Sequence, residues 1–146
     1  KLMGAQVATT VSASNVALVQ QLGTDIAIDY HKHAIQDILS DYDAVLDTIG
    51  DIDGGMDILS SGGRLITISA SLSPEQTQRA HNETKTIATG WLQPNGQDLQ
   101  QLADYIANDQ LKIIIDSQYP LTTSGIQAAH ARIESHHARG KIIINL

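Results

Sequence analysis

The stretch DTIG at residues 47–50 ends one apolar run, and GGR at residues 62–64 begins the next. Together they predict two buried parallel strands at residues 44–46 and 65–68, joined by a crossover helix over residues 52–59. The connection is long enough, because a βαβ crossover needs only about ten to twelve residues. In an open α/β sheet, ligands bind beyond the carboxyl ends of the strands. The polar residues that follow these two strands are therefore the first candidates for a binding site.

Small and polar residues follow each of the two strands. They are Asp47, Thr48, Ile49 and Gly50 after the first strand, and Ser69 and Ala70 after the second. Asp47 is also a suitable N-cap for the crossover helix, and the two roles are compatible. Ser69 and Ala70 are equally typical of a plain loop.

The rest of the chain alternates between strand-like and helix-like segments. Strands are predicted at residues 6–11, 26–30, 84–92, 112–116 and 141–146, and helices at residues 16–22, 33–40, 97–108 and 124–134. Ser12 or Ser14 is expected to cap the first of these helices. The SPE sequence at residues 73–75 begins either a surface helix or a loop that continues to residue 83. This alternation predicts an α/β fold with a doubly wound, mostly parallel sheet.

The composition limits the class of protein and its partners. Hydrophobic residues make up 42% of the 146 residues, but aromatic residues only 3%, so the core must be aliphatic. The net charge of −7 disfavours nucleic-acid binding. Cysteine is absent, which excludes disulfides and cysteine zinc sites. No apolar stretch reaches membrane-spanning length, and we expect a cytoplasmic protein without a membrane partner.

A series of short stretches extends over nearly the whole chain. They are GAQV at 4–7, LGTD at 22–25, IDY at 28–30, VLDTIG at 45–50, GGRL at 62–65, YPL at 119–121, AH at 129–130 and RGKI at 139–142. In this order they resemble the nucleotide-binding half of the medium-chain dehydrogenase/reductases, most closely the zinc-independent quinone oxidoreductase branch. No single motif is specific, but the ordered set is.

The resemblance implies a domain organisation. Residues 1–117 correspond to a partial dinucleotide-binding Rossmann domain, and residues 118–146 to a C-terminal segment that completes a catalytic barrel domain. The catalytic domain itself is not in this chain, nor are the first Rossmann strand and its glycine-rich phosphate loop. The glycine pairs at 54–55 and 62–63 do not have the G-x-G-x-x-G spacing of that loop.

The resemblance also implies a site for a nicotinamide dinucleotide. Thr10, Ser12 and Asn15 match the adenosine-ribose position, where an NAD-binding site has an acidic residue. The stretch 9–15 has no charge, which favours NADP, with NAD as the alternative. Tyr30 matches a position near the adenosine phosphate, although it is equally typical of a strand end. The residues at 47–50 and 69–70 match contacts around the nicotinamide and its ribose.

Metal binding and direct catalysis find little support in the sequence. The histidine pairs 31/33 and 136/137 have no acidic or cysteine partners, so no metal site is predicted. His130 is expected to be partly buried on its helix, and Trp91 to be a packing residue at a domain edge. No nucleophile–base pair or carboxylate pair stands out, and the catalytic residues are not assigned. In this family the cofactor carries out the hydride transfer.

The leading hypothesis is therefore the cofactor-binding portion of an NADPH-dependent oxidoreductase that reduces a quinone or an α,β-unsaturated carbonyl compound. The isolated chain is expected to be inactive. One alternative is a non-catalytic folding or dimerisation module, with a homodimer formed through the apolar edge strand from Lys112 to Asp116. Another is a zinc-type alcohol dehydrogenase homologue whose metal ligands lie in the absent domain. A methyltransferase-like Rossmann protein is disfavoured, because no acidic residue follows the strand at 6–11.

Overall fold

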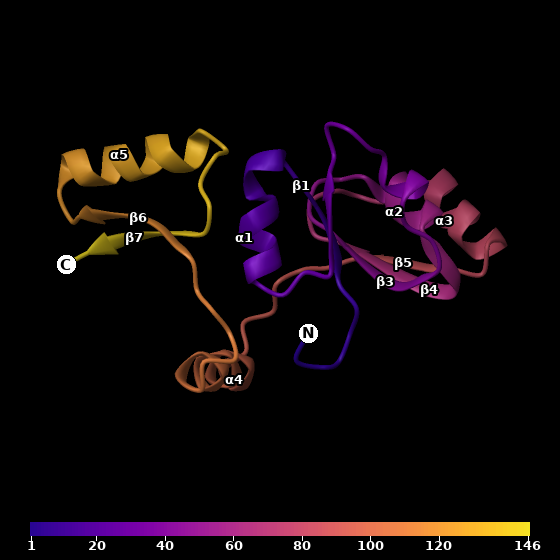
Figure 1. Ribbon diagram of the computed structural model, residues 1–146, viewed down its shortest axis with the longest axis horizontal. Helices are drawn as coiled ribbons and strands as arrows, with labels where there is room; N and C mark the ends of the chain where they lie inside the picture. The colour runs from indigo at the N-terminus through magenta and orange to yellow at the C-terminus, as the bar shows by residue number, and fades with distance from the viewer. The chain divides into compact units, whose positions relative to one another are not determined.

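A computed structural model describes all 146 residues, which form two compact units, Lys1–Pro94 and Asn95–Leu146. Figure 1 shows their helices and strands. The first unit contains β1 (Ala8–Val11), η1 (Ala13–Asn15), α1 (Val16–Gln21), β2 (Ile26–Asp29), η2 (Ile35–Asp37), β3 (Tyr42–Asp47), α2 (Ile52–Asp57), β4 (Leu59–Thr67), α3 (Pro74–Asn82) and β5 (Thr86–Thr89). The second contains α4 (Gly96–Ala107), β6 (Ile115–Pro120), α5 (Thr123–Glu134) and β7 (Lys141–Asn145).

All strand pairs are parallel, which confirms the predicted α/β class, but the strands do not form one sheet. The first unit has a two-stranded sheet, β1-β2, and a three-stranded sheet in the order β3-β4-β5. β1 and β3 are not hydrogen-bonded to each other. The expected parallel strands are present, and in this unit they are divided between two sheets where the resemblance placed the absent first strand. The physical reason is that no strand of this chain lies between β1 and β3 to supply the bridging hydrogen bonds.

A small apolar cluster nevertheless holds the two sheets of the first unit together. Ile28 of β2 packs with Leu39 and Ile58, which precede β3 and β4. Residues of β1, β2 and β3 pack around this cluster, including Ala8, Ile26 and Val45. The sheets therefore share side-chain contacts across the first unit without sharing a strand.

The main core lies on one face of the three-stranded sheet. Alternate residues of β3 and β4 point to this face, where Val45 and Leu65 are neighbours in register. Ile52 and Met56 of α2 and Ala80 of α3 complete the cluster. Figure 1 shows α2 and α3 together on this side of the sheet. As the composition predicts, the core contains no aromatic side chain.

The opposite face of the same sheet is not covered by helices of the first unit. Leu46 of β3, Ile66 of β4 and Ala88 of β5 lie in one row of the register and are all exposed, Leu46 to 66%. A doubly wound sheet would bury this row beneath a second helical layer. Within the first unit, helices therefore cover only one face of the three-stranded sheet.

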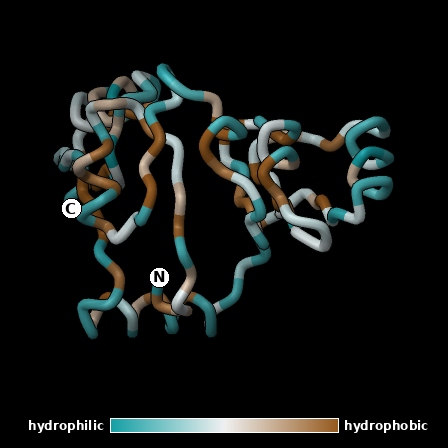
Figure 2. The backbone as a smooth tube through the Cα atoms, turned by 45° about the vertical axis from the view of Figure 1, so that its right-hand side comes forward, coloured by the Kyte–Doolittle hydropathy of each residue, from teal (hydrophilic) through white to brown (hydrophobic).

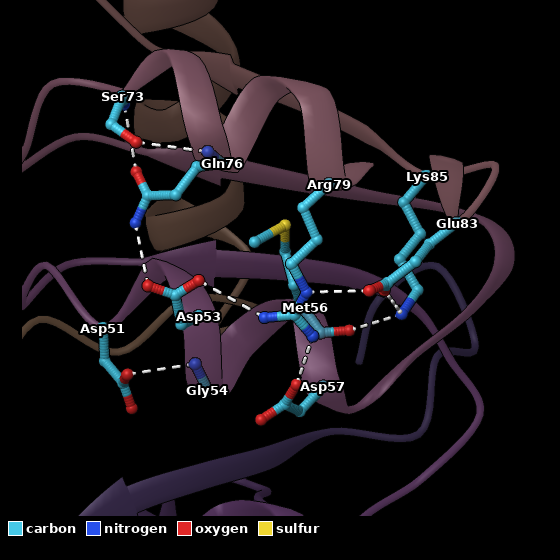
Figure 3. Close-up of polar contacts among 10 residues, drawn as sticks. All are labelled: Asp51, Asp53, Gly54, Met56, Asp57, Ser73, Gln76, Arg79, Glu83 and Lys85. Carbon is cyan, nitrogen blue, oxygen red and sulfur yellow. Dashed lines mark hydrogen bonds and ion pairs between the residues drawn. The ribbon is translucent and has the colours of Figure 1, made fainter. Parts of the chain in front are cut away.

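Ion pairs and amide hydrogen bonds fasten α3 to α2 (Figure 3). The guanidinium of Arg79 contacts Asp53 at 3.3 Å, Glu83 at 2.7 Å, and also Asp57. Lys85 donates to Glu83 at 2.7 Å. The hydrogen bonds from Lys85 and Arg79 lower the pKa of Glu83, while those to Glu83 and Asp57 raise the pKa of Arg79.

The segment after Ser73 is a helix rather than a loop. Ser73 accepts a hydrogen bond from the Gln76 amide, and the Gln76 side chain accepts one from the Ser73 amide. This reciprocal capping box satisfies two backbone donors that the first turn leaves free. Figure 2 shows α3 as hydrophilic along nearly its whole length, and Ala80 is its one buried residue.

Several predicted boundaries need correction. β4 begins at Leu59 instead of residue 65, because the chain pairs with β3 before and after an irregularity at Gly62, which has φ +81°. Only a 3₁₀ turn, Ile35–Asp37, forms within the predicted helix 33–40. β5 is shorter than predicted, as it covers only Thr86–Thr89.

The second unit pairs β6 with β7 in parallel and connects them through α5. The strand predicted from Lys112 to Asp116 is displaced, because β6 begins at Ile115 and continues through the domain boundary expected after residue 117. Asp116 accepts hydrogen bonds from Arg132 of α5 at 2.7 and 2.5 Å and from the Arg139 amide at 2.8 Å. These contacts, Arg132 first, lower the pKa of Asp116. No helix in either unit is long and apolar enough to cross a membrane.

Candidate functional site

The loop that follows β3 is organised around the carboxylate of Asp47. Asp47 is the last residue of β3 and is only 5% exposed. Its Oδ1 accepts hydrogen bonds from the amides of Ile49, Gly50 and Asp51 at 3.1, 2.9 and 3.2 Å. Its Oδ2 accepts one from the Thr67 hydroxyl, at the end of β4, at 2.6 Å. One buried side chain therefore joins the carboxyl ends of two neighbouring parallel strands.

The hydrogen bonds around Asp47 keep it ionised despite its position. Burial acts to raise its pKa, but the hydrogen bonds from Thr67 and from the three loop amides outweigh burial and lower it. The negative charge is thus balanced by donors that belong to the loop itself. Asp47 anchors the loop, because three consecutive loop amides donate to its Oδ1.

The capping role considered for Asp47 belongs to another residue. Asp51 is the N-cap of α2, and its side chain accepts a hydrogen bond from the Gly54 amide at 3.1 Å. Figure 3 shows this cap at the start of the helix. The cap lies four residues later than expected, because both aspartates precede a helical pattern and only tertiary contact distinguishes them.

The structure brings the two predicted loops together. Gly50 has φ +90°, a backbone conformation that favours glycine. A Cβ placed on Gly50 would lie 3.6 Å from the Cβ of Ala70 and 4.0 Å from Oγ of Ser69. The amides of Ser69 and Ala70 both approach the Thr67 hydroxyl oxygen at 3.3 Å. The residues predicted after β3 and β4 therefore form one surface, with Thr48 and Ile49 exposed at its edge.

A hollow of about 200 Å³ lies beside this surface, at the carboxyl ends of β4 and β5. Its lining consists of Thr67, Ile68, Ser69, Ala70, Ser71, Thr89, Gly90 and Trp91. Of these residues, only Ser69 and Ala70 are predicted site residues. The others follow from the register of β4 with β5, since strand ends that pair side by side must share one edge of the sheet.

The residues predicted for the adenosine side gather at the carboxyl ends of β1 and β2. Thr10 lies in β1, and Ser12 follows that strand. Neither Ser12 nor Asn15 caps a helix through its side chain, although Ser12 and Ser14 hydroxyls lie 3.1 Å apart. Oδ1 of Asn15 is buried and has no hydrogen-bond partner. This oxygen is therefore an unsatisfied buried acceptor of the loop, covered by protein atoms.

Tyr30 extends from the end of β2 and is 55% exposed. Its ring lies against that of His31, with 4.3 Å between the centroids. The Lys32 ammonium is 3.5 Å from the Asp29 carboxylate, so part of its charge is balanced locally. Tyr30 and His31 thus form an exposed, tilted aromatic pair at the carboxyl end of β2.

A second, shallow hollow of about 640 Å³ lies along the surface of α3. Arg79 and Glu83 line it, and both are held in the ion pairs that fasten α3. It contains no residue predicted for the site. No group of three or more histidine, cysteine, aspartate or glutamate side chains is arranged to hold a metal ion.

Comparisons with known proteins agree with this architecture. Residues 22–144 match a family described as zinc-binding dehydrogenase. An NADPH-dependent alkenal/one oxidoreductase of Arabidopsis thaliana chloroplasts is 31% identical over 95% of this chain and 33% of its own length. A chloroplast envelope quinone oxidoreductase homolog of the same plant is 29% identical over 99% of this chain and 46% of its own. The quinone oxidoreductase of Coxiella burnetii superposes with a TM-score of 0.85 at 26% identity, over 98% of this chain and 45% of that one.

The fold and the matches place the molecule among α/β proteins whose parallel strands resemble a nucleotide-binding domain. The chain belongs to the medium-chain dehydrogenase/reductase family and is similar to its quinone oxidoreductases and alkenal reductases. It spans about a third to a half of the length of these relatives.

Proposed function

We propose that this chain is the cofactor-binding portion of an NADPH-dependent oxidoreductase that reduces a quinone or an α,β-unsaturated carbonyl compound. The observation that carries the proposal is the Asp47 loop, which joins the carboxyl ends of β3 and β4 beside an open hollow. Relatives named for NADPH-dependent alkenal reduction and for quinone reduction support the choice of cofactor and substrate class. NAD is the alternative cofactor.

The residues on the adenosine side suit NADP better than NAD. Between residues 9 and 15 there is no acidic side chain to bind the ribose 2′-hydroxyl or to repel a 2′-phosphate. Thr10 and Ser12 offer hydroxyl groups at this edge. The donor and acceptor set at this edge therefore fits an adenosine ribose.

On the nicotinamide side, the residues of this chain would hold and orient the cofactor and would not take part in the reaction themselves. The bound cofactor would supply the hydride. Asp47 keeps its loop in one conformation through three amides, and Thr67 sets the position of Ser69 and Ala70. A backbone held in one conformation can orient the nicotinamide ring, and it need not rearrange when the hydride is transferred. We assign no acid–base residue in this chain, and we expect the chain alone to be inactive.

The cofactor preference is tested by isothermal titration of the chain with NADPH and with NADH. We expect NADPH to bind more tightly, and Asn15→Asp to weaken NADPH binding by at least about tenfold, since the new carboxylate would face the 2′-phosphate. Asn82→Asp makes the same charge change on α3 and should leave both affinities unchanged. Equal binding of NADPH and NADH, or equal effects of both variants, would contradict the choice of NADP.

The dimerisation module remains the second candidate. Ile113 and Ile115, within the segment from Lys112 to Asp116, are each about half exposed. Apolar side chains at this density are typical of a surface that pairs with another copy. Light scattering measures the mass of the protein in solution, and calorimetric titration measures whether it binds NADPH. A stable dimer that binds no dinucleotide would favour this candidate over the oxidoreductase.

A further inference from the structure

Trp91 has an unexpected position for the only tryptophan of the chain. The sequence predicts a packing residue at a domain edge; within this chain Trp91 is 85% exposed and lines the hollow at the carboxyl ends of β4 and β5. Exposing a ring of this size to water costs free energy that packing against a flat apolar partner recovers. The exposure therefore needs a reason at this site.

The backbone around Trp91 is fixed from the sheet side. The Gly90 amide donates to the Thr67 carbonyl at 2.8 Å. A Cβ on Gly90 would lie 3.0 Å from Cγ2 of Ile66 and 3.3 Å from Cγ2 of Ile68, so no larger residue fits there without displacement. The close approach of Gly90 to β4 holds the next residue, Trp91, at the rim of the hollow.

The chemistry of the lining favours a ring over a charged group. The Thr67 hydroxyl is engaged with Asp47 and with the amides of Ser69 and Ala70. Asp47 in turn is satisfied by the amides of its own loop. What remains for a ligand is the apolar surface of Ile68, Ala70 and the indole. The hydroxyl side chains of Ser69, Ser71 and Thr89 add neutral polar groups to the same lining. This is the combination that holds a planar heterocycle in proteins.

We propose that Trp91 is a specificity-determining residue of the cofactor site, whose indole packs against the nicotinamide ring in the hollow formed by residues 67–71 and 89–91. This inference rests on the proposed function and adds a residue that the family resemblance did not assign. An offset-stacked or edge-to-face indole is worth about a tenfold gain in affinity at most, because aromatic pairs add only a modest term to burial.

The test uses the 146-residue chain, in which Trp91 is the only tryptophan and its emission reports on this position alone. Oxidised NADP and nicotinamide mononucleotide, whose pyridinium ring quenches indole on contact, should quench it saturably. Adenosine 2′,5′-bisphosphate carries no nicotinamide and should leave the emission unchanged. Calorimetry then compares the affinities of the variants for NADP.

Trp91→Ala should weaken binding of NADP and of nicotinamide mononucleotide by about three- to tenfold, and Trp91→Phe by less, since a ring is retained. Leu92→Ala is the matched control, because Leu92 is 91% exposed and does not line the hollow. It should change neither affinity. Unchanged unfolding midpoints of all three variants, expected from their exposure, confirm that folding is intact.

The possible failures are distinct. If NADP gives no heat of binding to any form of the chain, the proposed function fails, and this inference fails with it. If NADP binds but Trp91→Ala and Leu92→Ala bind alike, and the emission does not respond, this inference alone is overturned. A blue shift of the emission with protein concentration, removed by Trp91→Ala, would make Trp91 an interface between copies and would also overturn it.

Discussion

At the scale of single residues, Asp47 shows how a polar side chain can organise the end of a strand. Five donors converge on one carboxylate that is almost fully buried: three loop amides and the hydroxyls of Thr67 and Ser69. A buried charge is tolerated only when it is satisfied in this way. Its neighbour Asp51 has the same side chain but caps a helix, so identical chemistry at a spacing of four residues serves two functions.

Replacing Asp47 by asparagine should destabilise the first unit by about 1–3 kcal/mol, because an amide cannot accept on both sides of the side chain. The carboxyl's pKa is lowered in the folded state from its ordinary value of 3.8. Its contribution is therefore complete above that value and is lost as the pH falls through the folded pKa. Urea unfolding of both proteins followed by circular dichroism should show a constant difference near neutral pH that narrows in acid. A difference independent of pH would contradict the assignment.

The contact of Asp116 with Arg132 is the corresponding feature of the second unit. Arg132 makes a bidentate contact with Asp116, in which Nε and Nη2 donate to the two carboxylate oxygens at 2.7 and 2.5 Å. Arg132→Lys should lower the melting temperature, because a lysine keeps the charge but loses the paired geometry. Arg132→Ala should lower it further. Arg64→Lys, on the exposed face of β4, is the matched control and should have no effect.

At the scale of elements, two glycines near the starts of helices allow the effect of tertiary packing to be separated from the effect of helix propensity. Gly125 lies in the first turn of α5, where a Cβ would overlap the Pro120 carbonyl oxygen of β6. Gly96 begins α4 and has open space around it. Both lie at the same kind of position along a helix, so a difference between them reports on tertiary contact.

Gly125→Ala should destabilise the protein by about 1–3 kcal/mol, because α5 would have to shift away from β6. Gly96→Ala should be neutral or stabilising by up to about 1 kcal/mol, because alanine favours the helix. Thermal unfolding of the two variants beside the parent checks both. Equal effects would mean that α5 does not rest on β6 as described.

The separation of β1-β2 from β3-β4-β5 belongs to the same scale. The hydrophobic runs at these strands were predictable, because a buried parallel strand has a local signature. The parallel pairing of β3 with β4 also follows from the local βαβ pattern. The other strand pairings do not, because they require backbone groups far apart in the sequence to meet. β1 and β3 each pair on one side only, and their shared contacts are limited to side chains.

At the scale of the whole molecule, the two units differ in how much they bury. The first contains both apolar clusters, whereas in the second only Gly125 and Ala129 are buried. The amphipathic helix α4 has no buried residue. Stability within a protein follows buried apolar contact, so the units should open independently.

Amide hydrogen exchange followed by mass spectrometry should therefore show slow exchange in β3 and β4 and faster exchange in α4, β6 and β7. The matched comparison is between the two parallel pairs β3-β4 and β6-β7, which have the same hydrogen-bond geometry but different burial. Similar protection in both pairs would contradict a difference in stability between the units. The cytoplasmic location and the homodimer stay predictions.

The α/β class, the positions of most strands and helices, and the loops at 47–50 and 69–70 that meet at one edge of the sheet all follow from the amino-acid sequence. These features follow from the periodicity of apolar side chains and from the small number of allowed backbone conformations. The tertiary structure was needed to show how the strands are distributed among the sheets, that Asp47 is a buried anchor, and that Trp91 is exposed at the hollow. The reason is that strand pairing, burial and exposure depend on which distant residues come together, and that information is not carried by any local stretch.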